Sequence, residues 1–452
     1  MENQDSQQMS DIYIVKTDSK DSQDGSDVSS YTIVEMLKPK VYQDGQVDQG
    51  YAWVTVLASF IVHFFAIGVT YVFGIYQEAY KQDPLLKDVS NFSISFIGSL
   101  TSAGLPIFSI ISGNLTEAYG HRLIGVIGGV LYFLAFTLAS FATQYWQLLL
   151  TQGFMLGMGI CFSYFPAITI LSQWFDKKKG IATGIAVAGS GVGGLVLGPM
   201  TTHLIASLGR SKSLLISGVL GGSMIILSAL SFRPRLPTSY AKKEYFSIFK
   251  NKHFRTLYIL TFITTFGYLI PFFYLPVYSV AKGVTVDQAA LIIGLLNGAS
   301  GVGRVILGHS ADRIGHLNTF TACLGLSSLA IMLIWPFAVN FASITTFGIV
   351  FGLFVGGYIS ILPTVIVQLF GLENIGGIFG MLYSSPLIGT VFGPSIAGAM
   401  IDSLTTTSNG VETTNFIPVI YYSGICMFIG FALLVKTVFD VRKENKEQLQ
   451  AV

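Results

Sequence analysis

The chain has 452 residues, of which 52% are hydrophobic and only 11% charged, and its formal net charge is +2. A typical soluble domain is about 25% charged, so this composition excludes an ordinary soluble protein. The small net charge gives no reason to expect a nucleic-acid partner. The mean hydropathy of +0.63 instead indicates a protein made mostly of membrane-spanning segments.

Residues 1–47 differ from the rest of the chain, because they are polar and rich in Ser, Asp and Gln. We expect this segment to be a disordered cytosolic tail. It contains no apolar stretch after a basic start, so we expect the first membrane helix to act as an uncleaved anchor.

Hydrophobic stretches of about 20 residues, each long enough to cross a bilayer as a helix, recur along the rest of the chain. The predicted spans are residues 52–78, 93–116, 122–142, 145–172, 180–207, 213–232, 255–280, 288–310, 317–338, 341–370, 376–401 and 416–438. The expected fold is therefore an all-α membrane protein with twelve transmembrane helices.

Basic residues predict the orientation of these spans. If both termini are cytosolic, five basic residues fall outside and all others except Arg304 face the cytosol. The five are Lys81, Lys87, Arg210, Lys212 and Lys282. The positive-inside rule therefore predicts cytosolic termini.

An internal repeat divides the twelve spans into two halves. "GNLTEAYGH" (113–121) and "GHSADRIGH" (308–316) align at an offset of 195 residues, and the same offset matches Gln173 with Gln368 and Pro199 with Pro394. Such duplications occur in transporter folds. The predicted segments are a tail 1–47, a six-helix half 48–232, a cytosolic linker 233–252, a six-helix half 253–440 and a cytosolic tail 441–452.

The stretch "AVAGSGVGGLVLGP" (186–199) has the glycine spacing of a dinucleotide-binding fingerprint. That fingerprint requires a preceding strand and a later acidic residue, whereas this stretch is one apolar run. Small residues four apart let membrane helices approach closely. We therefore interpret Gly189, Gly193, Gly194 and Gly198 as packing residues, together with the pairs Gly180/Gly184, Gly294/Gly298, Gly348/Gly352, Gly376/Gly380 and Gly389/Gly393.

No nucleophile and base, metal-ligand cluster or phosphate loop occurs in a context that would support catalysis. Cys161, Cys323 and Cys426 fall inside predicted spans and are interpreted as small core residues. We predict no enzyme activity, no metal and no cofactor.

The repeated loop has the pattern G-x-x-x-[DE]-x-x-G-H and resembles the cytosolic signature of the major facilitator superfamily. A carboxylate at a helix end, beside a glycine turn and a base, can hydrogen-bond neighbouring helix termini and hold an interface shut. The alternative is a solvated loop. The predicted gating residues are Gly113, Glu117, Gly120, Arg122, Gly308, Asp312, Arg313 and Gly315.

Two further segments resemble the paired signatures of the monocarboxylate transporter family, especially its fungal members. They are "DQGYAW" (48–53) and "WFDKKKGIATGIAVAG" (174–189). The resemblance implies two six-helix halves working by alternating access, with a substrate site between them.

Arg304 lies well inside the eighth span, where a charge is costly and normally faces a cavity or a partner. Asn297, Ser300 and Arg304 share a helical face. The family resemblance implies that this arginine binds the substrate anion, although the family's aspartate four residues earlier is Ser300 here. The alternative is structural pairing with helix carbonyls or a distant acid.

His63 lies in the first span, where the family's proton-coupled members carry a lysine that this chain lacks. Histidine titrates near physiological pH, so His63 is a candidate proton carrier. A hydrogen-bonded core histidine is the alternative. Tyr268 and Tyr274, beside prolines in the seventh span, are further substrate-site candidates, and that span could bend during gating.

The predicted function is transport of a small organic anion resembling a monocarboxylate, with or without a co-transported proton. Riboflavin or another heteroaromatic compound is the alternative cargo, and a non-transporting nutrient receptor is the alternative class. The lipid bilayer is the only other predicted partner. We expect the plasma membrane, with a vacuolar or other internal membrane as the alternative.

Overall fold

The computed structural model of the chain describes residues 47–83, 89–236, 245–408 and 411–450. The predicted disordered tail lies outside the described residues apart from Val47, and so does part of the predicted linker.

The N-terminal half follows the first six predicted spans closely. Its elements are α2 (Tyr51–Val62), the π-helix η1 (His63–Ile67), α3 (Gly68–Tyr71), α4 (Phe73–Lys81), α5 (Asn91–Tyr119), α6 (His121–Ser140), α7 (Tyr145–Leu148), the π-helix η2 (Leu149–Met155), α8 (Leu156–Trp174) and α9 (Lys179–Leu230). The fifth and sixth predicted spans are merged in α9. Gly209, with φ 79°, adopts a left-handed conformation between them and separates two membrane-length helices.

The C-terminal half follows the last six predicted spans. Its elements are the 3₁₀ helix η3 (Tyr245–Lys250), α10 (Lys252–Tyr268), α11 (Ile270–Ala281), α12 (Val286–Ile314), α13 (His316–Leu333), the 3₁₀ helix η4 (Trp335–Phe337), α14 (Phe341–Phe370), α15 (Ile375–Ser384), α16 (Leu387–Ser403), β1 (Thr405–Ser408), β2 (Val411–Thr414) and α17 (Ile417–Gln450). The antiparallel hairpin β1–β2, which pairs Thr405 with Thr414, was not predicted.

The described residues contain 11 helices long and apolar enough to cross a membrane. Because α9 contains two of the predicted spans, this number agrees with the predicted twelve. The predicted all-α membrane fold is confirmed.

Three of the described spans break part-way across, and the first and fourth spans each contain a π-helical stretch. The first span changes from α to π geometry at His63 and breaks at Val72, whose φ and ψ are −101° and 2°. The seventh span breaks at Leu269, two residues before Pro271, and the bending of this span during gating stays a prediction. The eleventh span breaks at Ser385 and Pro386. Proline removes a helix hydrogen bond, so the two proline-linked breaks have a local cause.

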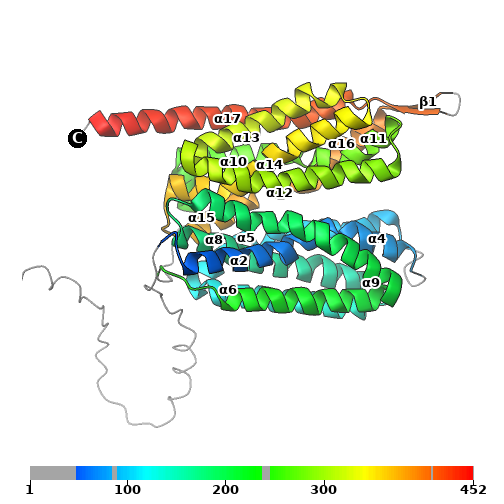
Figure 1. Cartoon of the computed structure of the whole chain (residues 1–452), viewed down its shortest axis with the longest axis horizontal. Helices are drawn as coiled ribbons and strands as arrows, with labels where there is room; N and C mark the ends of the chain where they lie inside the picture. The colour runs from blue at the N-terminus through cyan, green and yellow to red at the C-terminus, as the bar shows by residue number, and fades with distance from the viewer. Residues whose placement is uncertain (1–46, 84–88, 237–244, 409–410, 451–452) are drawn as a thin grey trace, which may run out of the picture. The chain divides into compact units, whose positions relative to one another are not determined.

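The two halves contact each other mainly through α9 with α12 and through α5 with α15 (Figure 1). At the end that carries the signature loops, these contacts are between backbones. A Cβ atom at Gly180 would collide with the carbonyl of Gly308, and one at Gly113 with the carbonyl of Gly376. Only glycine permits such close approach, so this end of the interface is tightly closed.

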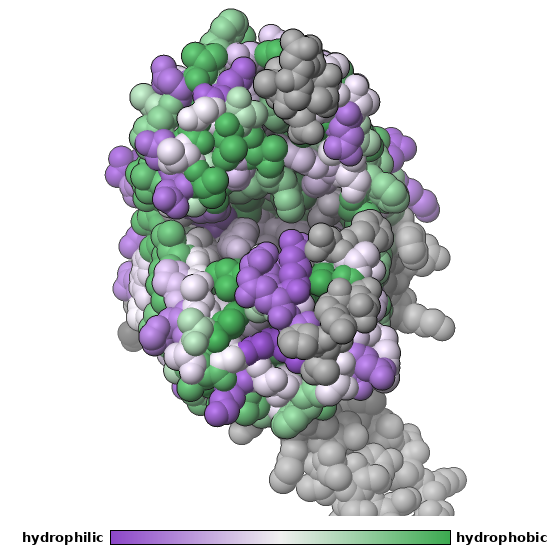
Figure 2. Space-filling view, turned by 90° about the vertical axis from the view of Figure 1, so that its right-hand side faces the viewer, coloured by the Kyte–Doolittle hydropathy of each residue, from purple (hydrophilic) through white to green (hydrophobic). Residues whose placement is uncertain are grey.

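The opposite end of α12 is open. At Gly294, Gly298 and Gly301, no described atom outside the helix itself lies within 4 Å of the position that a Cβ would take. Figure 2 views this end and shows a recess between the two halves. The interpretation of Gly294 and Gly298 as a packing pair is therefore wrong for this structure, because no described atom of a neighbouring helix packs on either glycine.

Glycines in the middle of α9 pack against the first span. Cβ atoms at Gly189 and Gly193 would collide with the carbonyls of Phe60 and Phe64, and one at Gly194 would lie 3.2 Å from Tyr71. Gly198 makes only an ordinary contact. α9 continues as a helix through all four glycines, so the context of a dinucleotide-binding turn is absent from this segment.

Candidate functional site

Arg304 lies at the interface between the halves and is 3% exposed. From α12 its Nη1 donates hydrogen bonds to the carbonyl of Val187, at 2.8 Å, and to the hydroxyl of Ser190, both on α9. Its Nε has no hydrogen-bond partner among the described residues. A permanently charged guanidinium is thus buried, and its described hydrogen bonds use only Nη1 and go only to neutral acceptors.

Asn297 and Ser300 lie two turns and one turn before Arg304 on α12, but the structure gives their side chains different contacts. Asn297 Nδ2 donates to the carbonyl of Ile293 in its own helix, at 3.0 Å. Ser300 is 1% exposed and lies where Gly356 of α14 packs against its backbone. Its hydroxyl has no partner among the described residues. Neither side chain forms a described hydrogen bond with Arg304.

His63 is buried on the N-terminal side of the same interface. Its Nδ1 lies 2.7 Å from the carbonyl of Ser59, which requires the proton on Nδ1 and leaves Nε2 as an acceptor in the neutral ring. Nε2 has no partner among the described residues, and the charge of Arg304 is close enough to act on the ring. His63 also begins the π-helix, a feature frequent at functional sites.

A pair of tyrosines joins the halves beside His63. The Tyr164 hydroxyl, on α8, donates to the Tyr383 hydroxyl, on α15, at 3.2 Å. The His63 ring contacts the Tyr164 ring edge-on, with centroids 5.1 Å apart. Neither tyrosine was predicted from the sequence, although each precedes a proline (Pro166, Pro386) within an apolar span, which was the available signal.

The structure separates the two tyrosines predicted in the seventh span. Tyr268 lies 6.3 Å, centroid to centroid, from Tyr358 of α14 and is close enough to feel the charge of Arg304. Tyr274 lies beyond the helix break and donates to the carbonyl of Pro394 in α16, at 2.7 Å. Tyr268 therefore packs beside α14, whereas Tyr274 contacts α16.

The carboxylates of the two signature loops bind helix termini of the opposite half. Asp312 accepts hydrogen bonds from the backbone N–H groups of Gly180, at 2.6 Å, and Ile181, at 2.9 Å, at the start of α9. Glu117 accepts one from Gly377 near the start of α15, at 3.2 Å. A helix N-terminus carries unpaired N–H groups and a partial positive charge, so a carboxylate is a favourable partner there.

The other signature residues have simpler positions. Gly120 and Gly315 have φ of 91° and 100° and end α5 and α12, which explains the requirement for glycine. Arg122 and Arg313 are exposed. Among the signature residues, the described hydrogen bonds across the interface are therefore made by the carboxylates and not by these bases.

The two family-specific segments contact each other. Asp48 accepts hydrogen bonds from the backbone N–H groups of Asp176, Lys177 and Lys178, at 3.0–3.1 Å, just before α9. The Tyr51 and Trp174 rings lie 5.5 Å apart. The first segment therefore holds the start of α9, the same helix that Asp312 binds from the other half.

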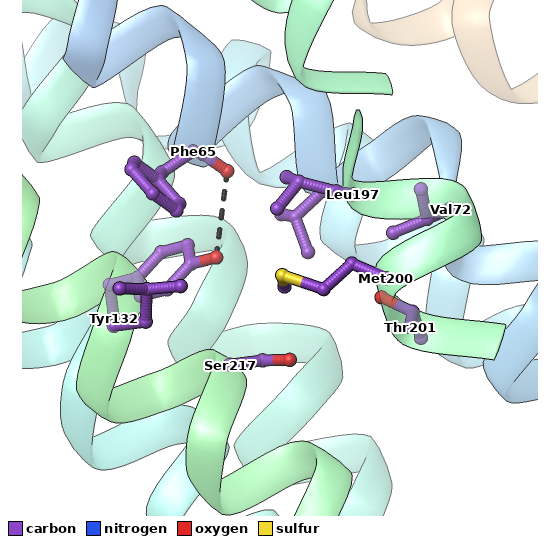
Figure 3. Close-up of a pocket in the computed structure, with 9 residues that line it drawn as sticks. Phe65, Val72, Tyr132, Leu197, Met200, Thr201 and Ser217 are labelled. Atoms are coloured by element: carbon purple, nitrogen blue, oxygen red, sulfur yellow. Dashed lines mark hydrogen bonds between the residues drawn. The ribbon is translucent and has the colours of Figure 1, made fainter. Parts of the chain in front are cut away.

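A small cavity lies inside the N-terminal half, between the first, third, fifth and sixth spans (Figure 3). Its volume of about 10 Å³ is room for a single water molecule. The Tyr132 hydroxyl, which donates to the Phe65 carbonyl at 3.5 Å, and the Ser217 hydroxyl lie at its wall. This cavity is too small for an organic substrate and does not lie between the halves.

Two interrupted, pseudo-repeated helix bundles with a buried cation between them define a membrane transporter. The sequence profile of the Major Facilitator Superfamily matches residues 55–341 and 282–451. The chain belongs to this superfamily.

Curated relatives agree with this assignment. The chain is 30% identical to the MFS transporter asaE of Aspergillus flavus, over 88% of this chain and 89% of that protein. It is 30% identical to the aspyridones efflux protein apdF of Emericella nidulans, over 84% and 76%. Among solved structures, the human organic anion transporter TETRAN has a TM-score of 0.68 at 14% identity, over 85% of this chain and all of that one, and shares the fold.

These relatives confirm the major facilitator resemblance and the prediction of a membrane transporter. The curated relatives are fungal transporters, and three of them bear names of efflux proteins, for aspyridones, agnestins and fujikurins. The narrower resemblance to monocarboxylate transporters remains a prediction.

Proposed function

We propose that this chain moves a carboxylate-bearing organic molecule across a membrane by alternating access of its two halves. The observation that carries this proposal is the environment of Arg304, a buried cation whose described hydrogen bonds all go to neutral groups. A substrate carboxylate provides two charged acceptors that match the planar guanidinium.

Aromatic side chains around this cation favour a substrate with a flat apolar part. Tyr164 and Tyr268 both lie within electrostatic reach of Arg304, and Tyr383 contacts Tyr164. Aromatic rings supply large apolar contact areas with few rotatable bonds. Small monocarboxylates and larger aromatic carboxylates both satisfy the charge requirement, and the rings favour the larger ones. A neutral heteroaromatic compound such as riboflavin would leave the arginine without an anion.

The direction of transport is proposed from the relatives. Several of them bear names of efflux proteins, so export is the proposed direction and the plasma membrane the proposed location. The distribution of basic residues supports cytosolic termini. In that orientation the closed end, with Glu117 and Asp312, faces the cytosol and the recess faces outside.

The test is transport by purified protein in proteoliposomes. The panel contains lactate, pyruvate, benzoate, naphthoate and riboflavin, each with and without a pH gradient. We expect saturable transport of a carboxylate, lower transport by Arg304→Lys and still lower by Arg304→Ala at equal folded protein. Saturable binding without turnover would instead support a receptor. Undiminished transport by Arg304→Ala would contradict the anion proposal.

A further inference from the structure

Ser190 and Val187 form a binding site for the Arg304 side chain on the opposite half. The Ser190 hydroxyl donates to the Val187 carbonyl at 2.9 Å and, through its lone pairs, accepts from Arg304 Nη1. Arg304 Nη1 also donates to Val187 at 2.8 Å. The three groups are thus mutually hydrogen-bonded, and Ser190 is 2% exposed.

This site lies where the packing between α9 and α12 changes from close to looser. On one side, Gly184 of α9 packs directly on the Arg304 carbonyl. On the other side the contact is looser, because a Cβ at Gly191 would lie 3.6 Å from the Cα of Gly301 and 3.7 Å from the carbonyl of Asn297. The hydrogen bonds of Arg304 therefore lie where the contact between α9 and α12 changes from direct backbone packing to ordinary van der Waals distance.

We propose that Ser190 and Val187 are a latch that holds the closed end shut through Arg304, and that the substrate carboxylate opens this latch by taking the guanidinium for itself. The inference rests on the proposed function in that the substrate is an anion. Anion binding and closure of the interface then compete for one side chain, which couples substrate binding to gating.

The chemistry of the latch suits this competition. A carboxylate offers the guanidinium a full opposite charge and two acceptor oxygens in a matching planar geometry, which a neutral carbonyl and a hydroxyl do not offer. A neutral carbonyl and hydroxyl hold Arg304 while no anion is present, and a carboxylate outcompetes them. An acidic residue at position 190 would give a permanent ion pair that a substrate could not replace.

The decisive variants are Ser190→Ala, which removes one acceptor, and Ser190→Asp, which supplies a charged one. Closure is measured in purified protein by maleimide labelling of Ser109→Cys, in a background with the three native cysteines changed to alanine. Ser109 is buried on α5, where Gly380 of α15 packs against its carbonyl, so it becomes accessible when this interface opens. Ser328→Ala, a buried serine bonded within α13 of the C-terminal half, is the matched control.

Without ligand, Ser190→Ala should label roughly tenfold faster than the parent, and Ser190→Asp more slowly than the parent. Naphthoate should accelerate labelling of the parent, whereas neutral naphthamide should not. Ser190→Asp should abolish the naphthoate effect, and Ser190→Thr, which keeps the hydroxyl, should behave like the parent. Ser328→Ala should leave labelling unchanged.

The latch and the proposed function fail in different ways. If Arg304→Ala transports normally, the anion proposal fails. If Arg304→Ala is inactive but Ser190→Ala and Ser190→Asp both label at the parent's rate, the anion proposal stands and the latch is wrong. Should Ser190→Ala fold poorly, the Asp and Thr variants decide the same question.

Discussion

Asp312 at the end of α12 and Gly180 at the start of α9 are joined by a 2.6 Å hydrogen bond from the glycine N–H to the carboxylate. The bond links the two halves, as does the equivalent bond from Gly377 to Glu117. Since both carboxylates lie at helix N-termini of the opposite half, the repeat produces two similar closures side by side.

Removing the charge at Asp312 should weaken this closure. In Asp312→Asn, the interface should open more often and labelling of Ser109→Cys should rise about fivefold, equivalent to about 1 kcal/mol. Glu117→Gln should have a smaller effect, because the bond from Gly377 to Glu117, at 3.2 Å, is longer than the bonds that Asp312 accepts from Gly180 and Ile181, at 2.6 and 2.9 Å. Asp287→Asn, an exposed carboxylate at the start of α12, is the control. Equal labelling of Asp312→Asn and Asp287→Asn would contradict the gating role.

Bulky substitutions of α12 glycines should distinguish its two ends. Gly308→Leu should prevent closure of the signature end, because its side chain would collide with the Gly180 carbonyl. Gly298→Leu should fold with a melting temperature close to the parent's, since the described structure leaves space there. If that end closes during transport, Gly298→Leu should lower turnover while binding persists. Normal turnover would show that this stretch of α12 stays open throughout the cycle.

A proton-carrying role for His63 can be separated from packing by the pH dependence of transport. His63→Gln retains hydrogen-bonding capacity but cannot titrate. If His63 carries the proton, uptake by this variant should no longer respond to an imposed pH gradient, while exchange of labelled for unlabelled substrate continues. An unchanged response would assign this histidine to the core.

Asp48 should stabilise the folded protein, although it lies close to the first described residue. Asp48→Ala leaves three backbone N–H groups before α9 without their acceptor, and we expect a loss of about 2 kcal/mol in unfolding free energy, measured as a lower melting temperature. Asp176→Ala is the control, because that side chain is 75% exposed and pairs only with Lys179 among the described residues. Similar melting temperatures for the two variants would refute this capping role.

The proposed orientation predicts which engineered cysteines an impermeant reagent reaches in intact cells. Cysteines at positions 245 and 445 should be protected, and Lys282→Cys, exposed between the seventh and eighth spans, should react. Permeabilised cells should label at all three positions. Labelling of positions 245 and 445 in intact cells, with position 282 protected, would show that the orientation is the opposite one.

The sequence by itself determined the membrane fold and the positions of the spans. Backbone groups in lipid must be satisfied within the segment, so long apolar runs have few alternatives to a helix. The 195-residue repeat also indicated that Glu117 and Asp312 have equivalent positions in the two halves, because duplicated loops occupy equivalent places. Arg304 could also be identified from the sequence, because a charge within an apolar span is costly and needs a specific environment.

Only the tertiary structure decided what these side chains contact. The spacing of Asn297, Ser300 and Arg304 predicted a shared face, but the neighbouring helices determine that Arg304 bonds Ser190 and Val187 while Ser300 lies against α14. Likewise, Gly184 and Gly298 have the same local pattern, yet one is in close contact and the other is open. Helical periodicity fixes which residues share a face within one segment, whereas the partner of that face depends on how segments far apart in sequence pack and diverge.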